Sequence, residues 1–188
     1  VRSRGLGDVY KRQMYTSAND DEGTPTESTT VLKTAADNFK AAAQNVIRII
    51  NKLAGNDNTL NVTLDNVNIT ANNDAALSVE GAGGTKITLK GDNTLTSGDG
   101  HAGLEHNEKS KDDNDDSVDT GKLTITSEKD SGILTATGGS GAAGIGGARN
   151  NGAGIIEIAG GNGGNGGAGI GSGSMAAGNT NITISGGT

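Results

Sequence analysis

Residues 143–171 read AGIGGARNNGAGIIEIAGGNGGNGGAGIG, so the tetrapeptide Ala-Gly-Ile-Gly occurs twice at a spacing of 25 residues. Glycine-rich segments of this kind are usually flexible linkers. A linker, however, has no reason to place Ile145 and Ile170 at the same phase of a repeat. A period near 25 residues is instead typical of a solenoid, in which each coil stacks on the one before it.

The same period is present in the rest of the chain after residue 60. Val62 and Ile87 are 25 residues apart, and Ile156 and Ile182 are 26 apart. A shorter element recurs between these segments, and its one recurring apolar position is occupied by Leu77, Leu104, Ile145 and Ile170. The long gap in this series contains a polar insert from about Glu105 to Thr120. The repeat therefore spans most of the chain and tolerates an insertion.

Segments that alternate aliphatic and polar residues fall at this period, which predicts short strands with one buried face. They are residues 61–64, 67–70, 86–89, 123–126, 133–137, 155–158 and 181–184. Such strands stack on their equivalents one coil away, about 4.8 Å along the axis. Crossover connections between parallel strands are right-handed. We therefore predict an all-β fold, a right-handed parallel β-helix over residues 56–188, and we expect the natural protein to continue beyond this truncated end.

The residues before this repeat divide into three predicted segments. Residues 8–13 match one translated reading frame of a transposon-derived sequencing adapter, so residues 1–13 are treated as an artefact. Residues 14–30 hold the one proline and little to bury, which predicts a disordered linker. Residues 31–55 carry apolar side chains at three- and four-residue steps, which predicts an amphipathic helix. A helix at this place would cap the first coil of the solenoid.

The amino-acid composition and the net charge exclude several kinds of binding partner and chemistry. The net charge of -7 and a pI near 4.7 oppose nucleic-acid binding, which needs a basic face. No apolar run is long enough for a membrane span, so we expect no membrane insertion. Cys and Trp are absent and aromatic residues make up 2% of the chain, so the core must be aliphatic and no thiol chemistry is available.

The acidic part of the insert predicts a calcium site. Asp112, Asn114 and Asp116 have the alternate spacing by which a calcium loop gathers oxygen ligands, and Asp119 would close the set. The loop lacks the turn glycine and the bidentate Glu of an EF-hand, and dense acidic loops are usually solvated. Calcium is the one cofactor that the sequence predicts, and we expect no cofactor-binding or catalytic residue besides these four metal ligands.

Three runs of the repeat carry a resemblance to known proteins. They are LNVTLDNVNIT (60–70), ITLKGDNTLTS (87–97) and LTATGGSGAAGIGG (134–147). These runs resemble the pectin-lyase-like parallel β-helix repeats of large surface proteins from Gram-positive gut bacteria, and they are similar to non-catalytic carbohydrate-binding β-helix domains. The resemblance covers residues 58–188. It implies a non-catalytic adhesion or carbohydrate-binding module, secreted or on the bacterial cell surface, that binds a polysaccharide or a host glycan and belongs to a longer chain.

Two other functions remain open on the sequence. A passive structural stalk needs only the fold. A polysaccharide lyase needs a cationic base beside carboxylates that hold calcium. Arg149 is the one arginine of the repeat region, and His101 and His106 are expected on opposite faces or in loops. These residues make a lyase the less favoured alternative.

The outward face of the strands also bears on the ligand. No Phe, Tyr or Trp occurs between residues 61 and 188, so stacking of sugar rings on aromatic side chains is excluded there. Polar contacts remain, either through calcium to acidic sugars or through rows of Thr and Asn. One outward column is predicted, formed by Thr63, Thr88, Thr124, Glu157 and Thr183. A threonine column suggests ice binding, but its single width and the interruption at Glu157 argue against that function.

Overall fold

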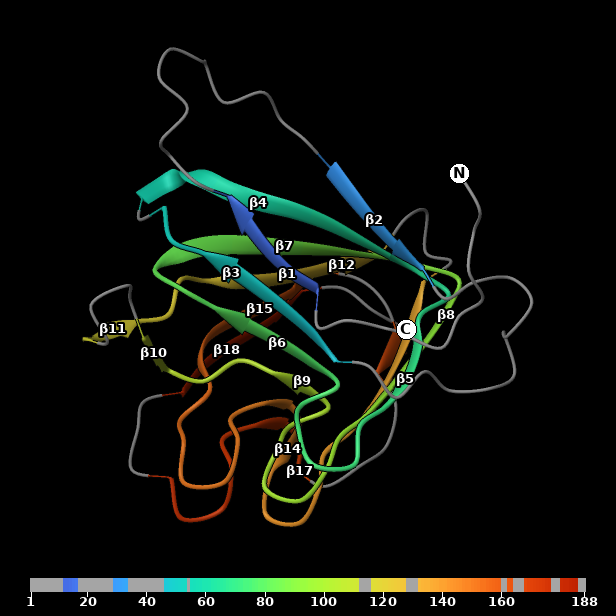
Figure 1. The fold of residues 1–188 in the computed structure, drawn as a ribbon, viewed down its shortest axis with the longest axis vertical. Coiled ribbons are helices and arrows are strands. Elements are labelled where there is room, and N and C mark those ends of the chain that lie inside the picture. The colour runs from blue at the N-terminus through green and yellow to red at the C-terminus, as the bar shows by residue number, and fades with distance from the viewer. Residues whose placement is uncertain are drawn as a thin grey trace, which may run out of the picture.

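The computed structural model describes residues 12–16, 29–33, 46–53, 55–111, 116–127, 132–159, 162–163, 168–176 and 180–185. All the regular elements in these residues are β-strands (Figure 1). The prediction of an all-β fold is therefore confirmed. The described residues form no helix that is long and apolar enough to cross a membrane.

The strands form four sheets. In the three larger sheets every neighbouring pair is parallel, and the fourth is the antiparallel pair of β10 (Lys109–Lys111) and β11 (Ser117–Asp119). Sheet A contains β1 (Arg12–Thr16), β3 (Ile47–Asn51), β6 (Leu77–Glu80), β9 (Leu104–Glu105), β14 (Ala143–Gly146) and β17 (Ala168–Gly171). Sheet B contains β2 (Thr29–Lys33), β4 (Gly55–Asp65), β7 (Gly83–Lys90), β12 (Leu123–Ser127), β15 (Gly154–Ala159) and β18 (Thr180–Ser185). Sheet C contains β5 (Asn68–Thr70), β8 (Asp92–Thr96), β13 (Ile133–Thr137) and β16 (Asn162–Gly163).

From β4 onwards the chain passes through sheets B, C and A in turn. The sets β4–β5–β6, β7–β8–β9, β12–β13–β14 and β15–β16–β17 are therefore equivalent repeats, each paired strand by strand with the next. Figure 1 shows β4, β7, β12 and β15 following one another across sheet B, with colours that run from teal through green to brown. This parallel arrangement is compatible with the predicted β-helix.

The registers confirm the recurring apolar position read from the sequence. In sheet A, Leu77 pairs with Leu104, Leu104 with Ile145, and Ile145 with Ile170. These side chains belong to one core of aliphatic residues that runs through all the repeats. Alternate residues of a strand point to opposite faces, so the polar neighbours Ser78 and Glu105 point away from this core, and both are nevertheless buried.

The helix predicted over residues 31–55 is wrong at both of its described ends. Residues 29–33 form β2 and residues 47–51 form β3, while residues 34–45 lie outside the described part of the chain. Ile47 pairs with Leu77. It therefore belongs to the same column as Leu77, Leu104 and Ile145 and lies one repeat before Leu77. Isoleucine at three- and four-residue steps fits a helix, but β-branched residues favour strands, and pairing with β6 buries Ile49 completely.

The predicted linker and adapter segments overlap two strands as well. Residues 12–16 form β1, which pairs with β3, and Thr29 and Thr30 begin β2. Residues 1–11 and 17–28 lie outside the described residues.

The register of sheet B corrects the predicted threonine column. Thr63 pairs with Thr88 and Thr88 with Thr126, whereas Thr124 pairs with Lys86 and Glu157. The predicted column therefore joined two neighbouring columns that are two residues apart. The cause is the insert, because it interrupts the 25-residue spacing and leaves the register across it unspecified by residue counting.

Candidate functional site

Two short strands on either side of the acidic part of the insert pair as a small hairpin. β10 (Lys109–Lys111) pairs with β11 (Ser117–Asp119) in an antiparallel register that sets Lys109 opposite Asp119. The ammonium group of Lys109 donates a hydrogen bond to a carboxylate oxygen of Asp119. This hydrogen bond, together with the charge of Asp119, raises the pKa of Lys109. Both side chains are exposed, and Figure 1 shows the hairpin of β10 and β11 at the edge of the molecule.

These contacts bear on the predicted calcium ligands. Asp116 and Asp119 are both exposed near this hairpin, and Asp112 and Asn114 lie outside the described residues. Among the residues that the structure describes, no three His, Asp or Glu side chains are grouped so that they could hold a metal ion. Asp119 is already neutralised by Lys109, so calcium would have to displace an ammonium group there. The four-residue site stays a prediction.

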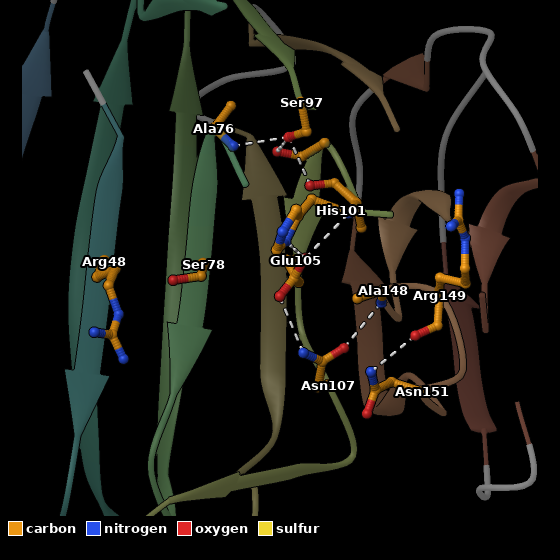
Figure 2. Close-up of polar contacts among 12 residues, drawn as sticks. Arg48, Ala76, Ser78, Ser97, His101, Glu105, Asn107, Ala148, Arg149 and Asn151 are labelled. Carbon is orange, nitrogen blue, oxygen red and sulfur yellow. Dashed lines mark hydrogen bonds and ion pairs between the residues drawn. The ribbon is translucent and has the colours of Figure 1, made fainter. Parts of the chain in front are cut away.

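A second cluster of polar side chains centres on Glu105, at the end of β9 on sheet A (Figure 2). Its Oε2 lies 2.9 Å from Nδ1 of His101 and accepts a hydrogen bond from the backbone N–H of Ala102 at 3.2 Å. Its Oε1 accepts a hydrogen bond from Nδ2 of Asn107 at 3.0 Å. Asn107 Oδ1 in turn accepts from the N–H of Ala148, 2.9 Å away in the next repeat. The cluster thus ties two repeats together.

Arg149 lies beside this cluster, in the loop after β14, and is bonded to its own chain. Its Nη2 donates to the carbonyl oxygen of Ser140 at 2.6 Å, and its backbone N–H donates to the carbonyl oxygen of Gly100 at 2.9 Å. Asn151 Nδ2 donates to the carbonyl oxygen of Arg149 at 3.1 Å (Figure 2). The guanidinium group is therefore engaged with a carbonyl group, as the imidazole of His101 is engaged with a carboxylate.

His101 and His106 lie in the loops on either side of β9, which is one of the two placements expected from the sequence. The loop position does not expose His106. Its side chain is fully buried, with Nδ1 2.6 Å from the carbonyl oxygen of Ala153 and Nε2 2.8 Å from that of Gly121. The ring fills the space where the chain leaves β9 for the insert and returns from it to β12. Sequence alternation could not reveal this, because both acceptors come from residues far along the chain.

Burial lowers the pKa of His106, and its hydrogen bonds to the carbonyl groups of Ala153 and Gly121 offset part of the lowering. The unfolded chain, with a histidine pKa near 6.5, therefore takes up a proton before the folded chain does. We expect the free energy of unfolding to fall as the pH drops below about 6.5, and to stop falling from this cause below the folded-state pKa. Urea denaturation at pH 7.5, 6.5 and 5.5 measures the effect. The variant His106→Gln should lose this part of the pH dependence, and an unchanged profile in that variant would contradict the assignment.

The outward face of sheet B is polar and charged. Two of its columns contain threonines, Thr63, Thr88 and Thr126 in one and Thr124 and Thr183 in the other. Its charged groups include the ion pair between Lys122 Nζ and Glu157 Oε2 at 2.9 Å, the pair between Lys90 Nζ and Asp65 Oδ2 at 3.6 Å, and exposed Lys86.

The outward face of sheet C is built of threonine rows. In β5, β8 and β13 buried residues alternate with half-buried polar ones, and β8 and β13 each begin with an exposed residue, Asp92 and Ile133. The half-buried residues form two columns, Asn68–Thr94–Thr135 and Thr70–Thr96–Thr137. This face does not follow from the residue spacing considered above. The signal that would have revealed it is the triplet Thr-Xaa-Thr at residues 94–96 and again at 135–137.

Comparison with known proteins adds no relative: no family model, no curated protein and no solved structure matches the chain.

Proposed function

We propose that the chain is a right-handed parallel β-helix module of a secreted or cell-surface protein, and that it binds polysaccharide without catalysing a reaction on it. The observation that carries the proposal is the set of outward threonines on sheets B and C, held in register from repeat to repeat. A sugar polymer also presents hydroxyl groups at regular intervals, so rows of side chains that donate and accept hydrogen bonds suit it.

The energetics favour a contact made of many weak bonds. A single hydrogen bond contributes about 0.5–1.5 kcal/mol net, which alone binds nothing firmly. Rows that repeat at about 4.8 Å let one polymer chain make several such bonds, and the later bonds form at high effective concentration. The rigid strands also spare most of the ordering cost of a flexible loop.

The contacts of the polar side chains that a lyase could use favour a structural role over catalysis. A catalytic base must reach a substrate proton, at roughly 2.6–3.2 Å. His101 is bonded to Glu105, Arg149 to the carbonyl of Ser140, and buried His106 to two backbone carbonyls. These contacts give each group a structural role within the chain.

A passive stalk is the second candidate, because the hydrogen bonds between repeats also suit a spacer. Affinity electrophoresis of the full chain separates the two functions. We expect retarded migration in at least one gel that contains pectin, xylan, a soluble cellulose derivative or mucin glycans. Unretarded migration of a protein that circular dichroism shows to be folded would favour the stalk.

The same gels test the predicted calcium site. We expect retardation in an acidic polysaccharide such as pectin to increase in the presence of calcium if the insert binds the ion. The variant Asp119→Asn removes one of the four predicted ligands and should abolish this increase. Lys109→Gln is the matched control, since it releases Asp119 from its ion pair and should leave the increase intact or larger.

A further inference from the structure

We propose that the outward face of sheet C contacts the polysaccharide, and that its ligand is an uncharged polymer in an ordered, insoluble array of parallel chains. This inference rests on the proposed function, because it names the face and the class of ligand. The face consists of the two columns of sheet C, Asn68–Thr94–Thr135 and Thr70–Thr96–Thr137.

The arrangement of this face is a lattice. Neighbouring strands lie about 4.8 Å apart, and alternate residues of one strand lie about 6.7 Å apart. The five threonines are therefore fixed at the points of a regular grid over three strands. Threonine is β-branched, so its side chain is restricted in rotation about its first bond, and its hydroxyl group loses little freedom on binding.

The hydroxyl groups of this grid are available to a ligand. The described part of the chain shows no hydrogen-bond partner for the side chains of Thr70, Thr94, Thr96, Thr135 and Thr137. All five residues are half-buried and alternate with buried residues along their strands, so each side chain keeps part of its surface on the outward face. Each hydroxyl both donates and accepts, as does each hydroxyl of a sugar, and either orientation of the ligand can be satisfied.

Charge separates this face from that of sheet B. The described outward positions of sheet C carry one charged side chain, Asp92, at the beginning of β8 and at the edge of the grid. The outward face of sheet B carries Lys86 and the two ion pairs of Lys90 and Lys122. An acidic polymer would meet no cationic side chain at the described outward positions of sheet C, whereas an uncharged polymer would bury no unpaired charge on the threonine grid.

The size of the grid explains why the ligand should be an array. Three strands and two columns cover roughly 10 Å by 7 Å, which gives only a few hydrogen bonds. A single soluble chain would cross the grid and use one column or one row. Chains held side by side in a solid meet both columns together, so the bonds add without the cost of ordering each chain.

The test is sedimentation of the full chain with microcrystalline cellulose, at low salt and in 0.5 M NaCl. The variant Thr96→Val with Thr135→Val removes two hydroxyls from adjacent strands and keeps the shape and the β-branched character of both side chains. We expect about tenfold weaker binding by this variant, since two lost hydrogen bonds correspond to about 1.4 kcal/mol or more. Ser140→Ala is the control, because it removes an exposed hydroxyl from the turn between β13 and β14, outside the threonine columns, and it should bind as the unchanged protein does. Salt should have little effect, because the contact is uncharged.

Four results would overturn the inference. Equal binding by the double variant and the unchanged protein would remove sheet C from the contact. Binding only to soluble polygalacturonate would leave the proposed function standing and refute the ligand class. Failure to bind cellulose, chitin or any soluble polysaccharide would refute the proposed function itself. Thermal hysteresis without binding to any polysaccharide would assign the grid to ice.

Discussion

Replacing Leu104 with alanine is expected to lower the free energy of unfolding by about 3 kcal/mol, within the range of 2–5 kcal/mol for buried leucines. Leu104 is fully buried in β9 and sits between Leu77 and Ile145 in the central column of sheet A. The core contains no described aromatic side chain that could move into the cavity. β9 is also only two residues long, so it contributes little backbone pairing to compensate.

Denaturation in urea, followed by circular dichroism, measures this loss. Ile155→Ala is the matched control, because Ile155 is 49% exposed on sheet B and its truncation leaves no cavity. We expect a change below about 1 kcal/mol for the control. Similar effects of the two variants would show that the aliphatic column does not stabilise the stack of repeats.

The apolar columns could be predicted from the sequence because they depend on spacing alone. Leu77, Leu104, Ile145 and Ile170 were placed at one position from their period, and the structure pairs them in that order. The insert between Leu104 and Ile145 does not disturb this position. The chain leaves the stack of repeats after β9 and rejoins it at β12, so the repeats on both sides keep their alignment. Burial demands the same phase on both sides of an insertion.

The columns of outward residues were harder to predict, because these residues are not buried and burial therefore does not fix which of them align between neighbouring strands. The column predicted from Thr63 to Thr183 crossed from one true column to another at the insert. The helical period of residues 31–55 predicts a helix at Ile47, and only the pairing of Ile47 with Leu77 shows that it lies in a strand. The spacing of residues along the chain therefore identifies the repeat. Where the first repeat begins depends on pairing between distant strands.

Buried polar residues were missed for a related reason. The partners of His106, the carbonyl groups of Ala153 and Gly121, are 47 and 15 residues away along the chain. Asn93 is a similar case, since its partners come from the repeats on either side of its own. A single sequence offers no signal for contacts that depend on the stacking of three repeats.

Asn93→Ala is expected to destabilise the protein by about 2–4 kcal/mol, comparable with the loss of a core leucine. Asn93 is 1% exposed in β8, and its Oδ1 accepts a hydrogen bond from the N–H of Val67 at 2.9 Å. Its Nδ2 donates to the carbonyl oxygens of Lys90, Gly91 and Ile133, each at 3.2 Å. One amide thereby joins three successive repeats at the turn between sheets B and C.

Alanine would remove the partner of the buried N–H of Val67, and an unsatisfied buried group costs about 1–3 kcal/mol. The carbonyl groups of Lys90 and Gly91 would keep their bonds from the N–H groups of Asn66 and Ile133, but would lose the bond from the Asn93 amide, which also bonds to Ile133 in the next repeat. Asn93→Asp tests the cause, since aspartate keeps the acceptor for Val67 but sets a negative charge against three carbonyl oxygens. We expect it to be at least as destabilising as alanine at pH 7. Asn151→Ala is the matched control, because that amide makes one exposed hydrogen bond to the carbonyl of Arg149. If Asn93→Ala cost no more than the control in thermal denaturation, stacking of the apolar columns alone would hold the repeats in register.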